Sequence, residues 1–264
     1  MAVTGRATDH YAGTADGWAR SAARVYGPIA HELVAAVPHL VSGLTVLDAG
    51  AGTGLVSEAL RAAGAHPVAA DLSLEMLRWQ QARRPPAVAA DVGRLPLRRH
   101  AVAAALAAFL LNHLPDAGPA LRELGRVPRP GGAVLATVYA NSSRSAVRDR
   151  VDEVAIAHGF RWPQWYLELK KVAAPRLGSA DAMAAAAHAA GLAAVRAEEY
   201  VADVGLDRAD HLIDYRFGQA HCRVWIAGLS RRDREELRTA AIAAIEPIME
   251  PYRPRIVRLV AAAP

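Results

Sequence analysis

The amino-acid sequence predicts an α/β fold in which helices cover both faces of a parallel sheet. Between residues 44 and 139, short apolar runs alternate with amphipathic stretches of helix length. The first apolar run leads directly into a glycine-rich segment, which is typical of a strand-to-helix turn at a ligand-binding sheet edge. The chain has 264 residues, 53% of them hydrophobic, which is enough to bury a sizeable core.

The central region is expected to contain strands and helices in alternation. Apolar runs predict strands over residues 44–49, 67–70, 87–90, 102–109 and 133–139. Helical spacing predicts helices between them over 54–63, 74–83 and 117–127. A repeated strand, helix and strand order implies a parallel sheet that is buried on both faces.

The two ends of the chain carry further elements. Residues 1–42 are expected to be mainly helical, with a turn at Pro38. Ser230 and Asp233 are placed to form a capping box, and residues 160–166 fit neither the helical nor the strand period. Helices are expected over 144–158, 179–190, 208–227 and 231–245, and strands over 192–204 and 255–262. We find no internal repeat or linker, so we expect one domain over 1–264.

Composition argues against several classes of protein. The net charge is +5, but the basic residues are scattered arginine pairs rather than one tract, so nucleic acid is not the expected partner. The single cysteine excludes an intramolecular disulfide and a cysteine metal cluster, and no metal site is expected. The longest apolar run, 101–111, is too short to cross a bilayer, and the first residues lack a signal peptide. We expect a cytoplasmic protein without a membrane partner.

The glycine-rich segment has the pattern Asp48-x-Gly50-x-Gly52-x-Gly54. Glycines let the backbone approach a ligand closely before it enters a helix. The spacing is not that of the dinucleotide fingerprint, because Leu55 stands where the third glycine should be. It also lacks the Gly-Lys-Ser/Thr of a phosphate-binding P-loop. A plain strand-to-helix turn is the alternative, but three glycines at alternate positions exceed what a turn needs.

This pattern resembles motif I of the class I S-adenosylmethionine-dependent methyltransferases. The likeness is greatest to the branch with ubiquinone-biosynthesis-like and bacterial natural-product enzymes. Asp71 ends the second strand, 21 residues after Gly50, where the resemblance implies that it binds the ribose hydroxyls. Residues 90–97 are similar to the adenine-contacting segment of the family, with Asp91 and Val92 as contacts. Residues 109–114 and 126–132 match the ends of the fourth strand and the approach to the fifth.

The resemblance implies a Rossmann-like, doubly wound sheet of seven strands in the order 3-2-1-4-5-7-6, with the last strand antiparallel. The cofactor would be S-adenosylmethionine and the product S-adenosylhomocysteine. Residues 44–139 would form the cofactor-binding core, and 1–42 a helical lid. Residues 140–264 would supply the remaining strands, with acceptor-lid insertions at about 141–178 and 205–250.

The implied cofactor contacts have ordinary structural alternatives. Asp71 could cap the next helix, and Asp91 could be a turn residue. Apolar side chains predicted to flank the cofactor could equally be core. The complete predicted set is Asp48, Gly50, Gly52, Gly54, Asp71, Leu72, Met76, Asp91, Val92, Phe109 and Leu110.

His113 is the titratable residue that the pattern places at the carboxyl end of a central strand, where it could act as a general base or line the pocket. Arg20 or Arg24 could pair with the methionine carboxylate of the cofactor. Aromatic residues in the lid regions could shape an apolar acceptor pocket or fill a small core. They are Tyr11, Trp18, Trp162, Trp165, Tyr166 and Tyr215.

The sequence therefore predicts methyl transfer to a small, largely apolar or aromatic acceptor. Bacterial secondary metabolism is the expected setting. An RNA or protein methyltransferase is an alternative that the basic charge would suit. A methyltransferase-fold cyclase or isomerase that uses its cofactor without chemistry is another. A homodimer and a monomer stay open as alternatives.

Overall fold

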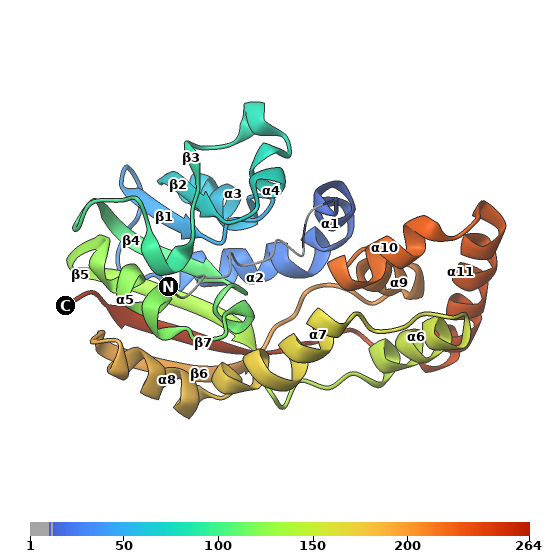
Figure 1. Cartoon of the computed structure of the whole chain (residues 1–264). Helices are drawn as coiled ribbons and strands as arrows, with labels where there is room; N and C mark the ends of the chain where they lie inside the picture. The colour runs from blue at the N-terminus through green and yellow to red at the C-terminus, as the bar shows by residue number, and fades with distance from the viewer. Residues whose placement is uncertain (1–10, 12) are drawn as a thin grey trace, which may run out of the picture.

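One seven-stranded sheet forms the centre of the computed structural model, which describes residue 11 and residues 13–264 (Figure 1). The strand order is β3-β2-β1-β4-β5-β7-β6. Strands β1 to β5 pair in parallel, whereas β7 runs antiparallel to both β5 and β6. The predicted fold class, strand order and antiparallel last strand are confirmed. The strands are β1 (Thr45–Ala49), β2 (His66–Asp71), β3 (Ala87–Ala89), β4 (Val102–Ala108), β5 (Pro128–Tyr139), β6 (Ala193–Val201) and β7 (Arg255–Ala262).

Alternate residues of the central strands pack on opposite faces of the sheet. Leu47 of β1 contributes to the core that also holds α5 and α8, and its neighbour Val46 contributes to the core beneath α2 and α3. β4 divides in the same way, with Ala105 on the first face and Leu106 on the second. Every one of these side chains is fully buried, which is why the strands appear as continuous apolar runs in the sequence.

Helices cover both faces and extend beyond one end of the sheet. The helices are α1 (Ala15–Ser21), α2 (Ala23–Ala35), α3 (Leu55–Ala62), α4 (Leu74–Arg78), α5 (Gly118–Arg126), α6 (Ala146–Ala157), α7 (Gln164–Glu168), α8 (Ala180–Ala189), α9 (Ala209–Phe217), α10 (Ala220–Gly228) and α11 (Arg231–Ile245). Figure 1 shows α6 and α9 to α11 gathered past the ends of the strands. A separate apolar core joins α2, α6, α9 and α11 there.

Three local predictions differ from the structure. The expected helix over 208–227 is two helices, because Gln219 adopts an extended conformation, with ψ at +148°, between α9 and α10. Residues 160–166 were expected to be irregular, yet α7 begins at Gln164, directly after Pro163 ends the extended segment. β5 begins at Pro128, five residues before the predicted start at residue 133. The capping box is confirmed: Ser230 Oγ accepts a hydrogen bond from the Asp233 amide at 3.1 Å.

Within the described part of the chain, no helix is both long and apolar enough to cross a membrane. Residues 1–10 and 12 of the predicted N-terminal lid lie outside the described residues.

Candidate functional site

A cavity of about 1480 Å³ opens at the carboxyl ends of β1, β2, β4 and β5. Its wall combines the glycine loop after β1, the ends of β2, β4 and β5, and side chains from α1, α2, α7 and α9. A cavity for one small ligand typically measures about 300–1,000 Å³. The observed volume therefore has room for two ligands side by side.

The glycine loop forms one end of this cavity. Gly50, Gly52 and Gly54 have φ angles of +68°, +51° and +105°, a region that other residues adopt only with strain. The amides of Gly50 and Ala51 both donate to the carbonyl of Ala70, at 2.8 and 3.1 Å. Gly50 and Gly52 line the cavity. Gly54 does not, and instead occupies the N-cap position of α3.

Asp71 joins the end of β2 to this loop. One carboxylate oxygen accepts from the Gly52 amide at 2.7 Å, and the other accepts from the Ser73 amide at 2.8 Å. Ser73, rather than Asp71, caps α4, because its hydroxyl accepts from the Met76 amide. Asp71 also lines the cavity, and a carboxylate oxygen is a hydrogen-bond acceptor of the kind that a ligand hydroxyl requires.

The other predicted cofactor contacts lie around the same end of the cavity. Asp91 accepts from the Gly93 amide at 2.8 Å, so it is a turn residue that also faces the cavity. Phe109 has a φ of +53°, a strained backbone conformation that directs its ring against Tyr26 and Tyr139, with centroids 4.7 and 4.8 Å away. The remaining members of this group that line the cavity are Leu72, Met76, Val92 and Leu110.

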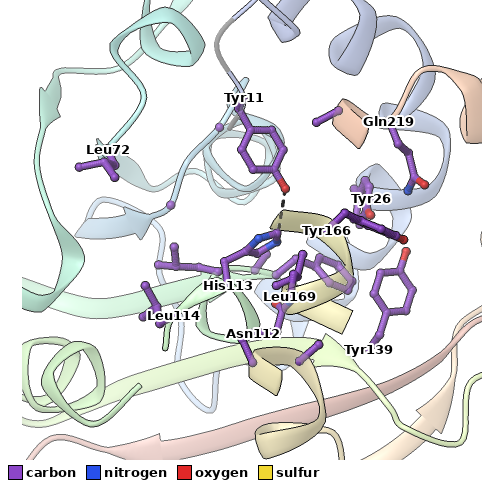
Figure 2. A pocket seen from close by; sticks show the side chains of 18 of the residues that line it. Tyr11, Tyr26, Leu72, Asn112, His113, Leu114, Tyr139, Tyr166, Leu169 and Gln219 are labelled. Carbon is purple, nitrogen blue, oxygen red and sulfur yellow. Dashed lines mark hydrogen bonds between the residues drawn. The ribbon is translucent and has the colours of Figure 1, made fainter. Parts of the chain in front are cut away.

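His113 and Tyr11 meet across the cavity. The Tyr11 hydroxyl lies 3.4 Å from His113 Nε2, as the dashed line in Figure 2 marks. Both side chains line the cavity. In the view of Figure 2, Leu72 lies on one side of this pair, and Tyr26, Tyr139 and Tyr166 gather on the other. The pair thus stands between the glycine-loop end and an aromatic end.

The predicted lid aromatics fall into two groups. Trp18, Trp165, Tyr166 and Tyr215 line the cavity together with Tyr11. Trp162 is not part of the lining: its ring packs edge-on against Phe160, at 4.9 Å, and stacks behind Tyr166. Arg20 pairs with Asp16 on the surface at 2.7 Å, and neither Arg20 nor Arg24 lines the cavity, so the expected pairing with a cofactor carboxylate has no geometric support.

Comparison with known proteins identifies the central region. Residues 47–136 match the family model of a methyltransferase domain. This region is therefore a methyltransferase domain, which agrees with the family that the glycine motif predicts. The same match supports the predicted enzyme class and cofactor.

Two curated relatives and one solved structure illustrate the extent of the likeness. The chain is 41% identical over 103 residues to a demethylmenaquinone methyltransferase of Mycolicibacterium paratuberculosis, which is 39% of this chain and 45% of that protein. It is 45% identical over 101 residues to a malonyl-[acyl-carrier protein] O-methyltransferase of Pseudescherichia vulneris, which is 38% of this chain and 40% of that protein. The chain thus matches less than half the length of these relatives.

The fold likeness extends further than the sequence likeness. A structure described as a methyltransferase from an antibiotic biosynthesis pathway of Anabaena variabilis superposes with a TM-score of 0.61 at 15% identity. The superposition covers 87% of this chain and 95% of that one. The likeness in fold therefore extends beyond the residues that match in sequence.

Asp48 is buried beneath the glycine loop, where it contacts Ser57 of α3, and it does not line the cavity. Its side chain is buried, and one oxygen accepts from the Ser57 hydroxyl at 2.6 Å, whereas the other has no partner among the described residues. Burial raises the pKa of the Asp48 carboxyl from 3.8 to about 6, although the Ser57 hydrogen bond lowers it. We had expected a direct cofactor contact here, and the buried position corrects that expectation.

This raised pKa predicts that the free energy of unfolding depends on pH. The unfolded chain ionises Asp48 near pH 4 and the folded chain only near pH 6, so this group lowers stability as the pH rises between these values. Asp48→Asn is expected to be more stable than the wild type at pH 8 by about 1–3 kcal/mol, with the difference vanishing near pH 4. Urea unfolding followed by tryptophan fluorescence measures it. An equal difference at both pH values would contradict the assignment.

Arg84 is a supporting residue that the sequence did not suggest. Its guanidinium donates to the Gly52 carbonyl at 2.8 Å and to the Met76 carbonyl at 2.6 Å, so it joins the glycine loop to the end of α4. Burial lowers the pKa of Arg84, opposed by Asp48 and Asp71 nearby. In the sequence, Arg84 is one of two adjacent arginines, and nothing in that pair indicates that it would contact the glycine loop.

We expect Arg84→Ala to loosen the loop and weaken S-adenosylhomocysteine binding by about ten-fold or more, since hydrogen bonds from a charged group contribute about 1.5–3 kcal/mol. Arg83→Ala is the matched control, because Arg83 is exposed and does not contact the loop. Titration calorimetry of both variants measures the effect. Equal affinities in the two variants would show that Arg84 does not hold the loop.

Four tyrosines gather at the aromatic end of the cavity, and only Tyr215 among them is predicted by the sequence. Tyr26, Tyr139, Tyr215 and Tyr252 come from four distant segments, and all line the cavity. The hydroxyls of Tyr139 and Tyr215 are 2.9 Å apart. Burial raises the pKa of each of these phenols. Only the position of Tyr139 at the carboxyl end of a strand could have indicated one of the others.

Proposed function

We propose that the chain transfers the methyl group of S-adenosylmethionine to a small acceptor with an aromatic or apolar body. The observation that carries the proposal is a single cavity with two different ends. The glycine loop and Asp71 line one end, and an aromatic group that includes Tyr26, Tyr139 and Tyr166 lines the other. The cofactor would occupy the first end and the acceptor the second.

The aromatic end favours a planar acceptor. Tyrosine and tryptophan rings offer large apolar faces and interact with aromatic ligands in stacked or edge-on arrangements. Trp18 stacks on Tyr26 at 5.2 Å, which gives this wall a rigid aromatic surface. One curated relative is named for demethylmenaquinone, which carries a ring, and another for malonyl-[acyl-carrier protein]. Because of this aromatic wall, we favour an acceptor that carries a ring. A role in secondary metabolism stays a prediction.

The chain's own task in this chemistry is alignment and exclusion of water. The cofactor supplies a methyl group on a sulfonium, which already has a good leaving group, and S-adenosylhomocysteine is its product. The residues around the cavity would hold the acceptor atom in line with that methyl group. The described part of the N-terminal lid, residues 13–42, and the segments at about 141–178 and 205–250 would close the cavity against water, within a single domain.

We propose His113 as the group that accepts a proton where the acceptor must lose one, because it lies between the two ends of the cavity. His113→Gln is expected to lower kcat by about 100-fold or more while S-adenosylhomocysteine affinity changes less than about two-fold. The limb of the pH profile on which the rate rises with pH is expected to disappear. A kcat close to that of the wild type would leave His113 as a lining residue.

Methyl-labelled S-adenosylmethionine tests the proposal directly. The purified protein is incubated with the labelled cofactor and a bacterial extract, which is then separated into small molecules, RNA and protein. We expect the label in a small aromatic compound. Label in RNA or protein would overturn the small-acceptor proposal, and cofactor binding without label transfer to any fraction would favour a non-methylating activity.

A further inference from the structure

Basic side chains gather at the aromatic end of the cavity. Arg144 precedes α6, Arg148 lies in its first turn, and Lys170 follows α7. Arg216 is near the end of α9. All four line the cavity although they come from three separate segments. An apolar pocket alone does not require this arrangement.

Two of these cations have no acidic partner within residues 13–264. Arg216 donates to both carboxylate oxygens of Asp152, at 2.6 and 2.8 Å, and Arg148 pairs with Asp149 at 3.0 Å. Arg144 donates to main-chain carbonyls, and Lys170 makes no ion pair among the described residues. The cations repel one another: burial, then Arg148 and Arg216, lower the pKa of Lys170.

Acidic groups nearby do not remove this excess of positive charge. Asp149 is already paired with Arg148, and Glu168, which also lines the cavity, accepts from Gln164 at 3.0 Å. Asp152 is paired with Arg216 outside the cavity lining. The region therefore favours an added negative charge.

Two buried polar groups beside these cations lack hydrogen-bond partners among the described residues. His221 is 4% exposed and Tyr252 is 3% exposed, and both line the cavity. His221 Nε2 and the Tyr252 hydroxyl are unpaired. The His221 ring stacks on Tyr166 at 3.9 Å, and burial, with Arg216, Lys170 and Arg148, lowers its pKa to about 2. His221 is thus a neutral group, whose ring can donate to or accept from a ligand. Buried polar groups are normally paired, so a polar ligand group is expected here.

We propose that the methyl acceptor carries an anionic oxygen group, a carboxylate or a phosphate, which binds between Arg148 and Lys170 beside His221 and Tyr252. This inference rests on the proposed function and makes its acceptor more specific. The acceptor ring would lie against Tyr166 and Tyr139, with its reacting atom toward His113. Arginine suits this task because its planar donors match a carboxylate or phosphate.

Binding to the protein loaded with S-adenosylhomocysteine tests the inference by calorimetry. The probes are aryl carboxylates, each paired with its primary amide, and aryl phosphates, each paired with its parent phenol. We expect at least one anionic probe to bind about ten-fold or more tightly than its neutral match, as one charge-assisted hydrogen bond would give. The carboxylate and phosphate sets show which anion fits.

Variants show whether the preference arises at the proposed residues. Arg148→Gln and Lys170→Gln should each remove most of the preference for the anion without changing S-adenosylhomocysteine affinity. Arg150→Gln and Lys171→Gln are the matched controls, because Arg150 lies on the same helix and Lys171 is the next residue, and neither lines the cavity. The Lys170 side chain as a whole is exposed to solvent, although its surroundings desolvate the ammonium group, so its variant should fold.

The outcomes separate this inference from the proposed function. Failure of S-adenosylhomocysteine to bind would overturn the proposed function itself. Cofactor binding with equal affinity for anionic and neutral probes, or with no measurable binding of any anionic probe, would overturn only the anionic acceptor. Loss of the preference in Arg150→Gln or Lys171→Gln would place the anion elsewhere.

Discussion

Gly52→Val is expected to weaken the binding of S-adenosylmethionine by up to about 100-fold. No protein atom lies within 4 Å of the position that a Cβ at Gly52 would take, and Gly52 lines the cavity, so the new side chain would project into the cofactor space. Overpacking costs about 1–3 kcal/mol, which corresponds to a dissociation constant raised on the order of 100-fold at the upper limit. Calorimetric titration with S-adenosylmethionine and S-adenosylhomocysteine measures the loss.

Gly131→Val is the matched control for this substitution. Gly131 also has a positive φ, +75°, and open space at its Cβ position, but it lies at the opposite end of β5 from the cavity. The two variants share the backbone strain of a branched residue in the left-handed region. If both lost binding equally, the effect would be strain or instability and not contact with the cofactor.

Asp71→Ala should weaken cofactor binding by about 1–3 kcal/mol, roughly 5–150-fold, through the loss of charge-assisted hydrogen bonds. The same carboxylate accepts from the Gly52 amide, so the variant should also mobilise the glycine loop. Hydrogen exchange of the loop amides and calorimetry measure the two effects separately.

Asp203→Ala controls for the loss of a turn contact in which an aspartate side chain accepts from the amide two residues later. Asp203 accepts from the Gly205 amide at 3.1 Å on the surface, away from the cavity. We expect its cofactor affinity to match the wild type. An unaltered dissociation constant in Asp71→Ala would mean that Asp71 only fixes the loop and does not touch the cofactor.

The elements of the sheet were predictable because their signals are local. β1 and β7 are bounded within one residue of the predicted ranges, since each is a short apolar run between turn residues. The glycine loop was predictable for the same reason, because its backbone conformations require glycine at the alternate positions 50, 52 and 54. Some predicted boundaries were wrong where the backbone leaves the helical conformation without a strong local signal, as at Gln219 between α9 and α10.

The acceptor end was less predictable because its residues meet only through the fold. Tyr26, Tyr139, Tyr215 and Tyr252 belong to segments that no sequence spacing relates, and their apolar or aromatic character also suits a core. The cations of the cavity could not be predicted because they resemble surface residues. In an arginine-rich chain, nothing in the sequence distinguishes Arg148 and Lys170 from side chains that face solvent. A lining aromatic and a packed one likewise look alike, as Trp165 and Trp162 show.

Isothermal titration of the purified chain with S-adenosylmethionine, and separately with S-adenosylhomocysteine, tests the central claim most directly. If the glycine loop and Asp71 hold the cofactor, both ligands should bind with micromolar dissociation constants, about −8 kcal/mol. Absence of binding to both at millimolar concentrations would contradict the assignment of this cavity end to the cofactor.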